Sequence, residues 1–179
     1  MSRARHLLAG LLVLAGCQSP PRAPLPLAQD VDLDLFMGDW YVIAATPTFM
    51  DRRAVDAVES YRRDADGSIA TTYTFRDTGF GGEQGRYTPR GFVVPGTGNA
   101  VWKMQFVWPI RADYRIAWLA PDYSQVVIAR EKRDYAWIMA RTPRIPEAQL
   151  EAHYAFLRTH GYEVGKLRRI PHSAAGGAR

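Results

Sequence analysis

The stretch "REKRDYAWIMARTP" (130–143) combines two different faces in one short strand. Successive side chains of a strand point to opposite sides. In a strand over 134–142, one side carries mostly small residues, namely Ala136, Ile138 and Ala140. The other side carries large ones, namely Tyr135, Trp137, Met139 and Arg141. The small face suits a helix docked outside and the large face suits an interior, so the stretch favours a barrel with a helix against it.

That helix is predicted directly after the strand, in "IPEAQLEAHYAFLRTHG" (145–161). Pro146 stands where a first helical residue is expected, and Gly161 stands where the helix should stop. Apolar and aromatic residues recur between them with the i, i+3, i+4, i+7 spacing of one helical face. These residues are Leu150, His153, Tyr154 and Leu157.

Upstream, "VDLDLFMGDWY" (31–41) is expected to open the domain with a short helical turn before the first strand. Seven further short strands precede the last one, each rich in aromatic and β-branched residues and bounded by turn sequences. With no helix between them, the strands should pair antiparallel in a sandwich or a closed barrel. The eight predicted strands lie near 40–46, 58–64, 68–76, 85–94, 100–107, 112–120, 123–130 and 134–142.

The single cysteine, Cys17, excludes an internal disulfide and a two-cysteine metal site. It follows Arg3, Arg5 and an apolar run over 7–16, which is the layout of a secretory signal and is too short to span a bilayer. The residues Leu14-Ala15-Gly16-Cys17 resemble a bacterial lipobox, in which the cysteine is lipidated and becomes the first mature residue. An ordinary signal peptide with a chance cysteine is the alternative.

The chain is therefore divided into four predicted parts. A lipoprotein signal peptide covers 1–16, and the lipidated cysteine with a proline-rich spacer covers 17–30. The spacer is either a semi-rigid extended segment or a disordered tail. The barrel domain covers 31–172 and a flexible tail covers 173–179. Gln18 is not the aspartate associated with inner-membrane retention, which favours the outer membrane, facing the periplasm.

Composition agrees with one exported globular domain. Hydrophobic residues make up 47% of the chain, enough for a packed core. The net charge of +5 includes two arginines of the signal, so the mature excess is small and scattered, which argues against nucleic-acid binding. A homodimer is compatible with the sequence.

Three short motifs, in order, resemble those of the lipocalin family, and more narrowly its bacterial outer-membrane lipoprotein branch. They are Gly38-x-Trp40 in "FMGDWYVIA" (36–44), Asp122-Tyr123 in "LAPDYSQVV" (119–127), and Arg141. The resemblance covers nearly all of 31–171. It implies an all-β fold, an eight-stranded antiparallel up-and-down barrel with one C-terminal helix packed outside.

In such a barrel, odd strands start and even strands end at the same rim. The three motifs should therefore meet at one end, with Arg141 over the face of Trp40. A guanidinium over an indole contributes about 0.5–2 kcal/mol. The resemblance gives structural rather than catalytic roles to Gly38, Trp40, Asp122, Tyr123 and Arg141.

Strand alternation places apolar and aromatic side chains inside the barrel, where the resemblance implies a cavity for a fatty acid such as palmitate, or a lysophospholipid. A core filled by these side chains is the alternative. Arg111 lies on a loop that could lean over the opening toward a headgroup, although the charges of that rim are nearly balanced and suit plain solvation. The predicted ligand-binding residues are Val42, Tyr73, Phe75, Trp102, Met104, Phe106, Arg111, Tyr114, Trp137 and Met139.

Catalytic motifs are missing from the sequence, which predicts no enzyme, no cofactor and no metal. The mature histidines, His153, His160 and His172, form no H-E-x-x-H pattern, and no G-x-S-x-G elbow is present. Two functions remain. The first is an anchored lipid binder, active in envelope maintenance. The second is a lipoprotein with a filled barrel that acts as a structural or interaction module, for which "GKLRRI" (165–170) offers a basic surface or only a solvated tail.

Overall fold

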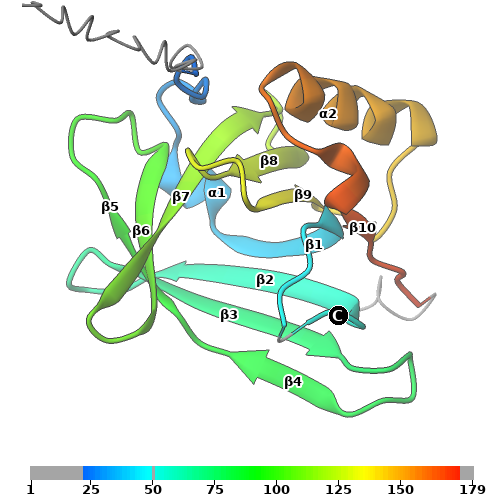
Figure 1. Cartoon of the computed structure of the whole chain (residues 1–179). Helices are drawn as coiled ribbons and strands as arrows, with labels where there is room; N and C mark the ends of the chain where they lie inside the picture. The colour runs from blue at the N-terminus through cyan, green and yellow to red at the C-terminus, as the bar shows by residue number, and fades with distance from the viewer. Residues whose placement is uncertain (1–21, 50, 174–179) are drawn as a thin grey trace, which may run out of the picture.

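A computed structural model describes residues 22–49 and 51–173 as a closed antiparallel β-barrel with a helix on its outside (Figure 1). The predicted signal peptide, Cys17 and most of the predicted tail lie outside the described residues. Neighbouring strands pair in chain order, and β9 pairs back with β1 to close the barrel. This confirms the predicted fold. The strands are β1 (Gly38–Ala45), β2 (Val55–Arg63), β3 (Ile69–Arg76), β4 (Gln84–Tyr87), β5 (Arg90–Val93), β6 (Val101–Val107), β7 (Ile110–Leu119), β8 (Gln125–Ala129), β9 (Ala136–Ala140) and the short β10 (Arg168–Arg169).

The fourth barrel strand differs from the prediction. The sequence indicated one strand over 85–94, whereas the structure divides it into β4 and β5. Both pieces pair with β3, at its end and at its beginning. Pro89 lies in the break, where it has no N–H to donate to a ladder and its carbonyl accepts from Thr71 N at 3.1 Å. Proline therefore ends one piece of the strand before the next begins.

The helix α2 (Glu147–Thr159) packs on the outer surface of the barrel (Figure 1). Its buried residues Leu150 and Leu157 form one hydrophobic cluster with the small outer face of β9. Pro146 is the residue before the helix rather than its first residue, and Gly161 follows its end with a φ of 84°. Left-handed φ values favour glycine, so the predicted stop is where glycine is needed. A single helical turn, η1 (Val164–Lys166), follows.

The two ends of the barrel are different. At the closed end lie the helix α1 (Leu33–Phe36) and the turns that follow β2, β5 and β7. At the open end lie the β1–β2 loop (46–54), the β3–β4 loop (77–83), the β6–β7 turn (108–109) and the β8–β9 loop (130–135). The segment before α1 runs along the outside of the barrel, where Ala28 N donates to Ile116 O at 2.9 Å.

Candidate functional site

Arg141 and Trp40 seal the closed end. The Arg141 guanidinium carbon lies 3.8 Å from the centre of the Trp40 ring, and Trp40 is fully buried. Arg141 also donates to the carbonyls of Asp39 and Leu35, both at 2.8 Å, and of Phe36 at 3.1 Å. These last two carbonyls belong to α1, whose last turn has no helical partner for them. One guanidinium therefore ties α1 and β1 to the end of β9.

The other two motifs lie at the same end. Asp122 accepts from the backbone and hydroxyl of Ser124 in the β7–β8 turn, at 3.0 and 2.6 Å. The Tyr123 hydroxyl accepts from Asp32 N at 2.8 Å, which joins this turn to α1. Gly38 has a φ of 93°, a backbone conformation that residues other than glycine rarely adopt. All three motifs thus hold the closed end together.

Aromatic side chains fill the barrel above this end. Trp102 is fully buried and donates from Nε1 to Asn99 O at 2.7 Å. Its ring stacks on Tyr114 at 5.3 Å and meets Phe36 and Tyr61 edge to face. This aromatic cluster blocks the barrel at its closed end, so a ligand would enter the interior from the open end.

A cavity of about 210 Å³ remains in the half of the barrel nearer the open end. Ligand pockets commonly measure about 300–1,000 Å³, so this one has room for a small ligand or for one end of a longer one. Its wall is mostly aromatic and apolar. The lining residues are Thr48, Asp51, Glu59, Thr71, Tyr73, Tyr87, Pro89, Met104, Phe106, Ala112, Asp113, Tyr114, Arg130, Tyr135 and Trp137.

Five of the ten predicted ligand-binding residues border this cavity, namely Tyr73, Met104, Phe106, Tyr114 and Trp137. Four others lie inside the barrel but are packed in its hydrophobic core: Val42, Phe75, Trp102 and Met139. Contact of the first group with a ligand stays a prediction. The second group has no surface on the cavity, because these side chains are covered by neighbours rather than left at its wall.

Arg111 lies elsewhere. It has the strand parity of Asp113 and Arg115, opposite to the inward-facing Tyr114, and its guanidinium stacks 3.8 Å over the ring of Phe92 on the outside. The basic side chain that borders the cavity is Arg130, from the β8–β9 loop. It lies 5.2 Å from the ring centre of Tyr135 and 3.4 Å from the carboxylate of Asp134.

Polar groups occupy the floor of the cavity. Tyr61 donates to the carboxylate of Glu59, and its oxygen lies 2.7 Å from the hydroxyl of Tyr114. Nearer the β1–β2 loop, Asp51 accepts from the Tyr73 hydroxyl at 3.1 Å and from Thr48. Glu59 and Asp51 thus add carboxylates to a cavity wall that is mostly apolar.

Burial, against the hydrogen bond from Tyr61 and with a smaller contribution from the nearby charge of Asp51, raises the pKa of Glu59 to about 7. Burial also raises the pKa values of Tyr61 and Tyr114. The hydroxyl of Thr71, a residue only 3% exposed, borders the same cavity and has no hydrogen-bond partner. A ligand atom or a water could satisfy it.

The sequence prediction missed this polar floor, although the signal was present. Ala57, Glu59 and Tyr61 alternate along β2, and the first and last of them are buried. Glu59 therefore shares their inward face, where a carboxyl group is unusual.

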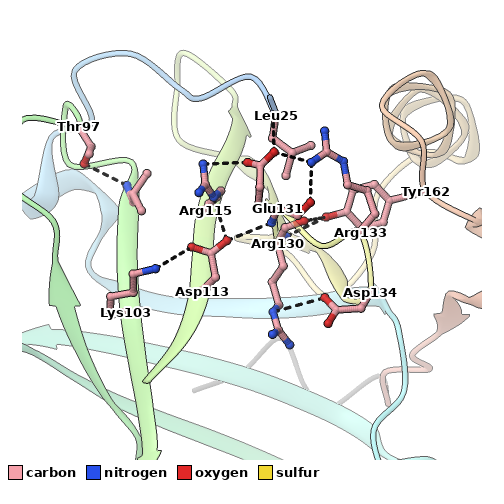
Figure 2. A network of polar contacts seen from close by, with 11 residues as sticks. Leu25, Thr97, Lys103, Asp113, Arg115, Arg130, Glu131, Arg133, Asp134 and Tyr162 are labelled. Atoms are coloured by element: carbon pink, nitrogen blue, oxygen red, sulfur yellow. Dashed lines mark hydrogen bonds and ion pairs between the residues drawn. The ribbon is translucent and has the colours of Figure 1, made fainter. Parts of the chain in front are cut away.

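A network of charged groups covers the outside of the barrel beside the cavity (Figure 2). Asp113 accepts from Lys103 and Arg115, and Arg115 also pairs with Glu131 at 2.9 Å. Glu131 in turn pairs with Arg133 at 2.6 Å. The amide of Glu131 donates to Asp113 at 3.0 Å, so the network fixes the β8–β9 loop, and with it Arg130, against β7.

Within 22–49 and 51–173, no group of three or more His, Cys, Asp or Glu side chains could hold a metal ion. His153 lies on the buried face of α2, where it pairs with Gln125 at 2.8 Å and burial lowers its pKa. In the same part of the chain, no helix is both long and apolar enough to span a membrane.

Comparisons with known proteins agree with this architecture. A family model described as a lipocalin-like domain matches residues 31–172. Temperature-induced lipocalin-1 of Arabidopsis thaliana is 26% identical, over 83% of this chain and 83% of its own length. Outer membrane lipoprotein Blc of Vibrio cholerae is 24% identical, over 92% and 96%. Among solved structures, insecticyanin from the tobacco hornworm Manduca sexta has a TM-score of 0.63 at 18% identity, with 89% of each chain covered.

Proposed function

The chain belongs to the lipocalin-like family, and we propose that it is a binding protein, not an enzyme, that holds the acyl chain of a fatty acid or lysophospholipid in its barrel. The observation that carries this proposal is the apolar cavity, closed by aromatic residues at one end and bordered by the loops of the other. A filled barrel would have left no such space.

The cavity favours entry of the acyl chain with its methyl end first. Each buried methylene contributes about 0.8 kcal/mol before the costs of association. A carboxylate at the floor would meet Glu59, whereas beside the β8–β9 loop it would meet Arg130. The small volume implies that only part of a long chain is enclosed, with the headgroup left beside the β8–β9 loop.

We extend the proposal to the location of the protein. Cys17 would carry the lipid anchor after removal of residues 1–16, and residues 17–30 would link it to the barrel domain over 31–172. Relatives from Vibrio cholerae and Citrobacter freundii carry the name outer membrane lipoprotein. They support a place in the cell envelope, and we propose the outer membrane with the barrel facing the periplasm.

The test uses residues 18–179, purified without detergent. Residues 22–173 include every strand of the closed barrel and both of its hydrophobic clusters, so this piece retains the whole fold. Native mass spectrometry, with lipid analysis of an extract, should find a fatty acid or lysophospholipid in stoichiometric amount. A protein that is empty and takes up no added acyl ligand would contradict the proposal and favour the interaction-module alternative.

A matched pair of variants locates the ligand. Ala112 borders the cavity, so Ala112→Trp should fill it and abolish uptake. Ala70 of β3 is the control, because it lies on the outer face of the barrel, between Arg62 and Arg90 of the neighbouring strands. Ala70→Trp should therefore leave uptake unchanged. Equal uptake by both variants would place the ligand outside the cavity.

A further inference from the structure

We propose that the open end of the barrel docks on a lipid bilayer by inserting the apolar side chains of its loops. The proposal goes beyond ligand binding. It draws on the proposed Cys17 anchor for orientation only, and its test dispenses with that anchor.

The exposed apolar side chains are strongly asymmetric. Seven large hydrophobic residues are exposed in the part of the chain that the structure describes, and six of them belong to the open end. Trp108 and Phe49 are 82% and 81% exposed, more than any other of the seven. The six are Phe49, Phe80, Phe106, Val107, Trp108 and Ile110, which we call the apolar rim. Exposed apolar surface concentrated in this way marks an interaction site, and tryptophan is typical of membrane interfaces.

Chain topology brings these residues to one end although they come from three connections. Phe49 lies in the β1–β2 loop, Phe80 in the β3–β4 loop, and Trp108 in the β6–β7 turn. In an antiparallel barrel these connections all join strands at the same rim. Contact with solvent alone does not explain why exposed aromatic side chains gather at one end while the other end exposes a single large hydrophobic residue, Leu35, among the described residues.

The start of the described chain lies at this end too. Arg133, in the β8–β9 loop, donates to Ala23 O at 2.5 Å, and Leu25 N lies 3.4 Å from Glu131 Oε1 (Figure 2). Cys17 is five residues before Arg22, and five residues span at most about 18 Å. A lipid on Cys17 would therefore hold the barrel by the side that carries its opening.

The span from Cys17 to Arg22 is similar to the distance by which the β6–β7 hairpin extends past β8. Ala129, the last residue of β8, pairs with Arg115 of β7, and β7 begins five residues earlier, at Ile110. At about 3.3 Å per residue, the β6–β7 hairpin projects about 17 Å beyond the last residue of β8. An anchor of similar reach lets the hairpin tip and the lipidated cysteine meet the same bilayer.

The charges of this end also suit an anionic surface. Arg52, Arg86 and Lys132 are exposed, and no acidic group of the described residues lies within ion-pair distance of them. Among the acidic residues of the β3–β4 loop, Glu83 alone is exposed and lies outside ion-pair distance of any basic group of the described residues. Basic residues near an anionic membrane are attracted to its surface. The ligand cavity would then open toward the bilayer that contains its ligands.

The test measures co-sedimentation of residues 18–179 with vesicles of phosphatidylethanolamine and phosphatidylglycerol. The wild type should partition onto the vesicles, and lipids brominated on their acyl chains should quench the fluorescence of Trp108. The variant Phe49→Ser/Trp108→Ser should lose at least about tenfold in partitioning, because a fully inserted large apolar side chain accounts for a factor of that order.

Leu35→Ser is the matched control, since Leu35 is 58% exposed at the closed end. It should partition like the wild type. Absence of wild-type partitioning, or an equal loss in Leu35→Ser, would overturn the proposal. Neither Phe49 nor Trp108 borders the cavity, so uptake of a soluble short-chain lysophospholipid should be unchanged in both variants. Failure to dock with normal uptake would reject the docking surface alone, whereas failure of uptake would reject the ligand-binding proposal.

Discussion

The carboxyl group of Glu59 should make the stability of this barrel depend on pH in an unusual direction. Its pKa is raised from the ordinary 4.5 to about 7 in the folded protein, chiefly by burial. Between these two values the folded chain binds a proton that the unfolded chain has released. The free energy of unfolding should therefore fall as the pH rises from about 4.5 to about 7, and then level off.

The size of the effect follows from the shift. Each pKa unit corresponds to 1.36 kcal/mol. Glu59 should therefore lower the free energy of unfolding by about 3 kcal/mol at pH 8 relative to pH 4. In Glu59→Gln this penalty is absent, while the amide oxygen can still accept from Tyr61. The variant should match the wild type near pH 4 and be more stable by up to about 3 kcal/mol at pH 8.

The assay is urea unfolding of both proteins at a series of pH values from 4 to 8. The difference between the two free energies cancels the contributions of all other titrating groups. Glu151→Gln, at an exposed position on α2, is the control and should leave the pH profile unchanged. A wild-type-minus-Glu59→Gln difference that is constant with pH would refute the argument, because the carboxyl would then have the same pKa folded and unfolded.

Three further predictions concern the closed end and the anchor. Arg141→Lys should lower the free energy of unfolding by about 2–4 kcal/mol, because an ammonium cannot stack on Trp40 while donating to three carbonyls; urea unfolding within 0.5 kcal/mol of the wild type would contradict this. Gly38→Ala should cost about 1–2 kcal/mol in the same assay, since its φ of 93° is strained for alanine. Cys17→Ser should abolish the incorporation of labelled fatty acid into the protein in growing cells, with undiminished labelling as the contrary result.

The barrel and its helix could be predicted because both depend on local signals. The alternation over Ala136 to Ala140 separates an outer face, which does pack under α2, from an inner one. The break at Pro89 was missed because a proline inside an aromatic-rich run competes with the alternation around it, and only the ladder with β3 shows which prevails.

The cavity was predicted less well, for a geometric reason. Alternation says which face a side chain is on, but not its height along the barrel axis. Trp102 and Met104 share the inner face of β6, yet the first fills the closed end and the second borders the cavity. Height depends on strand register and shear, which no local pattern contains. Glu59 was overlooked for a different reason. Alternation along β2 places it on the inner face, but a carboxyl group is not expected inside a barrel.

The most direct test of lipid binding is the affinity for lysophospholipids with chains of six to twelve carbons, measured by calorimetric titration below their micellar concentrations. Ala112→Trp, which fills the cavity, is measured beside the wild type. If the acyl chain enters the cavity, wild-type affinity should rise up to about fourfold with each methylene, as about 0.8 kcal/mol of burial requires. The rise should stop once the cavity is full and should be absent in Ala112→Trp. An affinity that does not depend on chain length, or that is equal in the two proteins, would contradict a ligand held inside the barrel.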